Sequence, residues 1–258
     1  MKKQKKAQNS LNLHVQKIIG FMKRNRKQTI AGFAVVLIAS SFIVTPLLGD
    51  ASATPTPTGY PSPSDAVATP YGSIGKWMIK SNGEVADYGG QKYQGKKLLE
   101  AINVIIVDSA SKSVSESKAK MNKAMSTAGF PARFGHSGGF KGLISGVQYK
   151  QLPSTLLTAY SDKSFLAVNN HGRLFGPSPV NGGGYVYSGA FSTEKFATYN
   201  YIPAHVYVSS NKARNALAAK MTAVGQTQLP SIDMSNAYNT VDTTVGDHDG
   251  MAAVVVLK

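Results

Sequence analysis

Residues 102–130 read INVIIVDSASKSVSESKAKMNKAMSTAGF, and this stretch predicts more about the fold than any other. Its first six residues are apolar with one exception, which is typical of a buried strand. Apolar and small residues then recur at helical spacing over 114–128, and Gly129 follows where a helix would end. Asp108 and Ser109 stand where a helix cap is expected. The stretch therefore predicts a strand followed by a helix.

A second unit of the same kind lies near the other end of the chain. Residues 205–208 read HVYV, which favours a strand. A helix is predicted over residues 211–224, with Ser210 as its cap and Gly225 at its end. The apolar run 252–257 predicts a closing strand.

The region between these two units is rich in glycine and in short apolar runs. Residues 140–191 hold several runs of strand type, separated by turn residues. Strand–helix units that flank a strand-rich stretch favour an α+β fold. We therefore expect residues 71–258 to form a single α+β domain, with a mixed β-sheet and about two main helices.

Composition limits the kinds of site that the chain can hold. The sequence has no cysteine, which excludes disulfides, cysteine-bound zinc and a thiol nucleophile. Its formal net charge is +15, but the lysines of the predicted domain are scattered rather than grouped in a basic stripe. This pattern argues against a nucleic-acid partner and favours a membrane or cell-wall surface or another anionic ligand.

The first 53 residues indicate export. Residues 1–29 are basic and contain no Asp or Glu, and residues 30–48 form an uncharged, mostly apolar run. An Ala-Ser-Ala sequence at 51–53 suits cleavage of a signal peptide after Ala53. The length of the apolar run instead suits a retained single-span anchor, since spanning helices need about 20 residues. Either alternative makes the protein extracellular or membrane-anchored with the domain facing outside.

A linker is expected next. Residues 54–70 are rich in Pro, Ser and Thr and have no apolar run to bury. Such a composition is typical of a semi-extended spacer that holds a domain away from a surface.

Four blocks in the predicted domain resemble the LssY C-terminal-like domain family by their order and spacing. The first is the 102–130 stretch quoted above. The other three are NNHGRLFGP at 169–177, YVYSGAFSTEKF at 185–196 and HVYVSSNKARNALAAKM at 205–221. The resemblance covers roughly residues 101–225.

This resemblance implies a fold and a membrane-adjacent setting more than a reaction. Members of the family often carry phosphatase-like or other membrane domains on the same chain, which this sequence lacks. The resemblance assigns no chemistry to the domain itself.

A block of polar residues is the predicted site for an anionic ligand: Asn169, Asn170, His171 and Arg173, with His205 added from the later strand. His171 and Arg173 would share one face if both lie in a strand. A guanidinium beside an imidazole can bind phosphate or carboxylate.

The alternative interpretation of this block is structural. In that case Arg173 would be a buried residue tied to Glu194 or Asp162, with little left to offer a ligand.

A metal site, if there is one, must use histidines and carboxylates. The predicted domain has four histidines, and their spacing matches no standard metal signature. The candidate ligands are Asp247, His248 and Asp249, and a divalent metal is the cofactor that such residues could hold. His136 is the remaining histidine, in a Gly-rich segment. The alternative for 247–250 is an ordinary polar turn before the last strand.

Two functions remain open from sequence. The first is an exported cell-envelope domain that binds an anionic ligand or partner at the membrane or wall. The alternative is a hydrolase for phosphate-bearing envelope substrates, with or without a metal, whose site is lined by His171, Arg173 and His205 together with Asp247 and His248.

Overall fold

The computed structural model describes residues 59–199 and 201–258. The predicted signal or anchor at 1–53 and the start of the predicted linker lie outside this part. No helix within the described residues is long and apolar enough to span a membrane.

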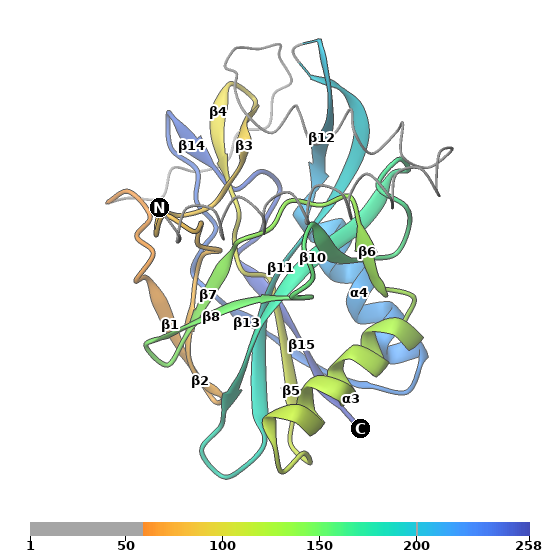
Figure 1. The fold of residues 1–258 in the computed structure, drawn as a ribbon. Coiled ribbons are helices and arrows are strands. Elements are labelled where there is room, and N and C mark those ends of the chain that lie inside the picture. Colours follow the sequence, from red (N-terminus) through yellow and green to blue (C-terminus); the bar gives the residue numbers. More distant parts are fainter. Residues whose placement is uncertain (1–58, 200) are drawn as a thin grey trace, which may run out of the picture. The chain divides into compact units, whose positions relative to one another are not determined.

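Fifteen strands and two helices make up the described part (Figure 1). The first eight strands and the first helix are β1 (Ala66–Thr69), β2 (Gly72–Gly75), β3 (Asp87–Tyr93), β4 (Lys96–Leu99), β5 (Val104–Asp108), α3 (Val114–Thr127), β6 (Ala132–Phe134), β7 (Lys141–Ile144) and β8 (Val147–Leu152). The others are β9 (Thr158–Ser161), β10 (Asn169–Pro179), β11 (Tyr185–Tyr199), β12 (Ile202–Ser209), α4 (Ser210–Ala223), β13 (Thr227–Asp233), β14 (Thr243–Thr244) and β15 (Met251–Leu257).

The expected α+β class is wrong, because the described residues are mostly β. They are 48% strand and only 14% helix. Strands occupy the segments on both sides of the first strand–helix unit, β1 to β4 before it and β6 to β12 after it, and none of these segments adds a helix. The strand–helix units are real, but they are a minor part of a large sheet.

That sheet is organised around its two longest strands. The main path of the 12-stranded sheet runs β1-β2-β7-β8-β10-β11-β5-β15-β13. β10 pairs with β11 along most of its length, and its other edge is shared between β9 and β8. β11 in turn pairs with β5 through its first residues and with β12 through its last ones. A separate three-stranded sheet has the order β14-β4-β3.

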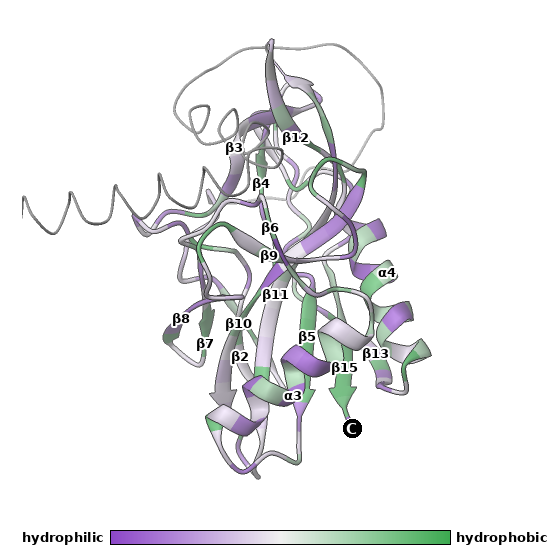
Figure 2. Cartoon of the chain, turned by 45° about the vertical axis from the view of Figure 1, so that its right-hand side comes forward, coloured by the Kyte–Doolittle hydropathy of each residue, from purple (hydrophilic) through white to green (hydrophobic). Residues whose placement is uncertain are grey.

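The centre of the sheet has a separate core on each face. Val104 and Ile106 of β5 pack in one cluster with the buried residues of α3 and α4. Ile105 and Val107 pack in the other cluster, with residues of β2 and β7. β5 and β15, which form the parallel pair, are therefore apolar on both faces, as their colour in Figure 2 shows.

Both helices begin at a serine cap close to the expected position. Ser113, rather than Asp108 or Ser109, caps α3 by accepting a hydrogen bond from the backbone N–H of Glu116. Asp108 instead accepts from two backbone N–H groups in the preceding turn and forms an ion pair with Lys120. In α4 the cap is Ser209, one residue before the predicted one.

The folded part also begins earlier than the sequence suggests. The predicted linker extends to residue 70, yet β1 lies within it and pairs with β2. Asp65 accepts a hydrogen bond from the indole N–H of Trp77, and its carbonyl accepts one from the Lys76 N–H. The expected boundary at Tyr71 therefore falls between two paired strands.

Candidate metal centre

Three neighbouring strands bring polar side chains to one face of the sheet. Across the β10–β11 pair Asn169 lies opposite Glu194, and across the β11–β12 pair Phe196 lies opposite His205. Side chains two residues apart in a strand share a face, so His171 joins this set. Arg173 and Phe175 continue the same face of β10, and Phe175 belongs to the core away from the helices. The polar set therefore lies on the face opposite α3 and α4.

His136 reaches the same place from a loop that follows β6. The backbone N–H groups of Gly135 and His136 both donate to the carbonyl of Leu157. Arg173 donates from Nη2 to the carbonyl and to the hydroxyl of Ser137, at 2.7 and 3.0 Å. These bonds fix the loop against the sheet, so His136 is held in position from both sides.

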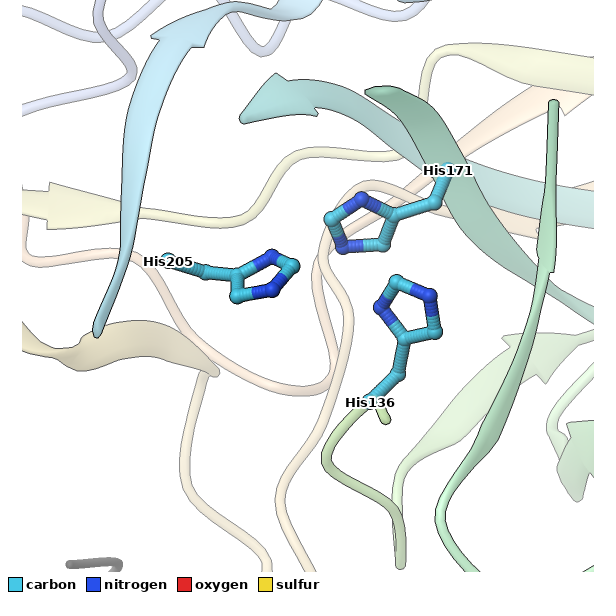
Figure 3. A group of neighbouring side chains, drawn as sticks. All are labelled: His136, His171 and His205. Carbon is cyan, nitrogen blue, oxygen red and sulfur yellow. The ribbon is translucent and has the colours of Figure 1, made fainter. Parts of the chain in front are cut away.

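The three imidazole rings point toward one another (Figure 3). The ring centroids of His136 and His171 are 4.3 Å apart, and that of His205 is 5.6 Å from His136 and 5.8 Å from His171. One ring nitrogen of each lies within 4.8 Å of the corresponding nitrogen of the other two. We call His136, His171 and His205 the histidine cluster.

Ring nitrogens of the cluster lack hydrogen-bond partners although they are buried. The Nε2 atoms of His136 and His205 have none among the described residues. His171 uses its Nδ1 in a 2.7 Å hydrogen bond with the side-chain oxygen of Asn169, and its other ring nitrogen, Nε2, lies 3.5 Å from an oxygen of Glu194. Buried polar atoms are normally satisfied, so this arrangement calls for a ligand.

A buried carboxylate stands beside the cluster. One oxygen of Glu194 lies 3.5 Å from His171 Nε2, and the other lies 3.4 Å from His205 Nδ1. The first oxygen also accepts a 2.9 Å hydrogen bond from the Ser192 hydroxyl. Carboxylates that orient histidine ligands through the second ring nitrogen are a recurring feature of metal sites.

The electrostatics of the cluster favour metal ligands over charged histidines. Burial lowers the pKa of His136 to about 2, and the neighbouring His171, Arg173 and His205 act in the same direction. Burial also lowers the pKa of His171 to about 4, although Glu194 opposes that shift. A neutral imidazole is the form that binds a metal, so both rings are ready to do so at neutral pH.

Glu194 is ionised in this environment. Burial by itself would raise its pKa, but His171, His205 and the Ser192 hydroxyl outweigh that effect and lower the pKa to about 2. The carboxylate therefore supplies a negative charge next to three nitrogen donors, which suits a divalent cation.

Comparisons with known proteins neither name nor exclude a family. No protein-family model, no curated protein and no solved structure matches the chain. The resemblance to the LssY C-terminal-like domain family stays a prediction.

The predicted anion-binding block is divided by the structure. His171 and His205 belong to the histidine cluster, and Asn169 is hydrogen-bonded to His171. Asn170 instead donates to Asp162 and accepts from the Thr193 hydroxyl.

Arg173 is buried, as the structural alternative had it, but its partner is different. Its guanidinium contacts Ser137 and lies 4.7 Å from the ring centroid of Phe140, and its buried Nε has no hydrogen-bond partner among the described residues. The carboxylates proposed for it have other ion-pair partners, which are His171 and His205 for Glu194 and Lys220 for Asp162.

The other candidate metal ligands do not join the cluster. Asp249 forms a two-pronged ion pair with Arg214, and Asp247 accepts hydrogen bonds at the start of α4. His248 Nε2 is bonded to Asn236. The metal site at Asp247, His248 and Asp249 stays a prediction, and both of its carboxylates make contacts with α4 in the structure.

Sequence reasoning named His136 without including it in a site and missed the position of Glu194. The position of Glu194 could have been predicted from the β10–β11 hairpin, because counting residues outward from the turn shows which residues of the two strands lie opposite each other. The register shifts between Phe175 and Ser178, however, and a shift of one residue moves a side chain to the other face. His136 carries no such signal, since it lies in a loop.

Proposed function

We propose that this domain binds one divalent transition-metal ion through His136, His171 and His205, and that the ion holds an anionic ligand by an oxygen atom. The observation that carries the proposal is the convergence of three imidazoles, one ring nitrogen of each lying within 4.8 Å of the others, while the Nε2 atoms of His136 and His205 have no hydrogen-bond partner among the described residues. A site with three protein nitrogens leaves room for a water molecule or ligand at a metal such as Zn²⁺.

The surroundings of the cluster support an ion rather than a packed apolar core. Asn169 and Glu194 each hold the second nitrogen of a cluster histidine, which fixes the ring for coordination. Arg173 lies on the same face with an unsatisfied Nε, and that N–H could donate to an oxygen of the bound anion.

Metal titration tests the proposal directly. The purified full chain, stripped with a chelator, is titrated calorimetrically with Zn²⁺, and bound metal is then counted by elemental analysis. We expect one ion per chain, with affinity reduced roughly 100-fold or more in His171→Ala and His205→Ala, since each removes one ligand.

His248→Ala is the matched control, because His248 is also a buried histidine but is bonded to Asn236 outside the cluster. It should bind Zn²⁺ as the wild type does. Thermal melting of each metal-free variant separates loss of a ligand from loss of the fold. Folded cluster variants that bind as well as the wild type would end the proposal.

A second candidate function is hydrolysis of a phosphate ester, and the position of Glu194 favours it. Its carboxylate lies beside the cluster, where it could take a proton from an attacking water, and a metal held by the three histidines would make that water more acidic. The water oxygen would then bond to phosphorus as the ester P–O bond breaks, and the alcohol would leave with a proton.

Release of p-nitrophenol from bis-p-nitrophenyl phosphate by Zn²⁺-loaded and Mn²⁺-loaded protein tests this candidate. Turnover that disappears in a metal-loaded Glu194→Gln variant would support hydrolysis. Tight metal binding without turnover of any phosphate ester would leave the binding function alone.

The setting of this function stays a prediction from sequence. Export, anchoring by residues 1–53, and a membrane or cell-wall partner rest on the basic and apolar N-terminal segments. If they hold, the metal site faces the cell envelope.

A further inference from the structure

The three histidines of the cluster differ in how much of their surface is exposed. His136 and His171 are buried to about the same degree, with 4% and 3% of their surface exposed. The His205 side chain keeps 18% of its surface exposed. A ligand that approaches the proposed ion at the most exposed of its three histidines would therefore come past His205.

Two phenylalanine rings flank that approach. The ring of Phe165 stacks on His205 at 6.0 Å between centroids, and the ring of Phe196 meets His205 edge-on at 6.1 Å. The two phenylalanine rings contact each other in a T-shaped arrangement at 6.2 Å. We call Phe165 and Phe196 the aromatic rim.

The rim is held in place although it faces solvent. Phe196 is 37% exposed on β11, directly across from His205 on β12. Phe165 packs against Gly135, where a side chain of any other residue would overlap the ring. Exposure of an aromatic ring to water is unfavourable. Two rings held in place beside a polar site therefore differ from the side chains of an ordinary solvated loop.

From these contacts we propose that the ligand of the metal carries an apolar group, acyl or aryl, which packs on Phe165 and Phe196 while its oxygen donor binds the ion. The inference rests on the metal site proposed above. Ligand pockets commonly combine a few polar groups with an apolar wall. Here the ring centroids of Phe165 and Phe196 lie 6.0 and 6.1 Å from that of His205.

Hydroxamic acids provide probes for this ligand, since they bind a metal through two oxygens and differ only in the attached group. Acetohydroxamate, hexanohydroxamate and benzohydroxamate are titrated into the Zn²⁺-loaded full chain. We expect the hexanoyl and benzoyl compounds to bind roughly tenfold tighter or more than the acetyl compound, because only they bury apolar surface on the rim. Preference for one of the two separates an acyl from an aryl group.

Phe196→Ala and Phe165→Ala should remove most of this preference and leave the affinity for acetohydroxamate within about threefold of the wild type. Val208→Ala is the matched control. Val208 is exposed to the same 37% and lies three residues from His205 in β12, but it is not part of the aromatic rim. It should keep the preference.

The outcomes separate this inference from the metal proposal. Absence of bound Zn²⁺ overturns both. Binding of Zn²⁺ and acetohydroxamate with no preference for the larger groups overturns the apolar-ligand inference alone. The aromatic rim could instead contact a second copy of the chain. In that case the protein would be a dimer, and Phe165→Ala and Phe196→Ala would dissociate it without changing the hydroxamate preference. This result would also overturn the apolar-ligand inference.

Discussion

At the scale of single residues, the cluster combines neutral imidazoles with one ionised carboxylate. Lowered pKa values keep His136 and His171 uncharged, and Glu194 retains its charge beside them. The contacts of Glu194 with His171, His205 and Ser192 favour its ionised form, so the carboxylate adds a negative charge beside the cluster that a bound cation would neutralise.

Replacement of Glu194 by Gln should weaken metal binding without abolishing it. The amide keeps the size of the side chain but removes the charge that faces His171 and His205. We expect the affinity for Zn²⁺ to fall roughly 10- to 100-fold, as for other residues that support metal ligands. Calorimetric titration measures the loss, and an unchanged dissociation constant would contradict the role given to Glu194.

A second buried carboxyl group gives a prediction about pH. Burial raises the pKa of Glu100 from 4.5 to about 8, with Glu194 adding to the shift and Arg173 opposing it. The protonated group suits the fold, so its contribution to stability is complete below pH 4.5 and is lost as the pH rises through 8.

Glu100→Gln should therefore be more stable than the wild type at pH 9 by roughly 2–4 kcal/mol, and similar to it at pH 4.5. Urea unfolding at several pH values measures both proteins. The difference in unfolding free energy between the two proteins reports on Glu100 alone, because both proteins contain the same histidines. A gap that stays constant with pH would contradict the buried, protonated state.

At the scale of elements, the site depends on the close approach of β10 and β11 at a glycine, where no side chain separates the two strands. Gly172 lies in β10 between His171 and Arg173, and a Cβ there would overlap the carbonyl oxygen of Ala190 and the ring of Phe191. The overlap with backbone cannot be relieved by a rotamer change, so β10 and β11 would have to move apart.

Gly172→Ala should destabilise the protein by at least about 2 kcal/mol and reduce metal binding with it. Gly138→Ala is the control, since its Cβ would meet nothing closer than the Gln151 amide at 3.4 Å. Denaturant unfolding gives both free energies, and equal stabilities for the two variants would mean that the strands tolerate the added methyl group.

The elements themselves differ in how well sequence predicts them. The helices α3 and α4 follow from apolar spacing and serine caps, and β5 and β15 follow from unbroken apolar runs. The class of the fold does not follow, because it depends on which of the many short apolar runs pair, and on the register shifts in the β10–β11 and β11–β12 pairs. Of the site residues, His171 and His205 could be predicted from sequence. The position of His136 depends on the path of a loop, and that of Glu194 depends on a register shift.

At the scale of the whole domain, the first strand is joined to the rest by more than backbone pairing. β1 covers β2, and Asp65 contacts Lys76 and Trp77 just before it. A segment that looks like a spacer in sequence is therefore part of the cooperative unit.

A chain shortened to begin at Tyr71 should melt roughly 5–10 °C below one that begins at Tyr60, because it loses β1 and the Asp65 contacts. The Tyr60 chain keeps every described contact of β1 and serves as the control. Differential scanning calorimetry measures the melting temperatures of the two chains. Equal melting temperatures would mean that residues 60–70 act only as a linker.

The place of β15 has a consequence for how the protein is made. This strand lies between β5 and β13, yet residues 251–257 are synthesised after every other strand of the described part. During translation β5 and β13 stand with open edges on either side of an unfilled position, and open apolar edges are where nascent chains join the wrong partners. The central sheet can therefore close only after the last strand of the described part has been made, so loss of residues 251–257 would leave β5 and β13 without the strand that joins them.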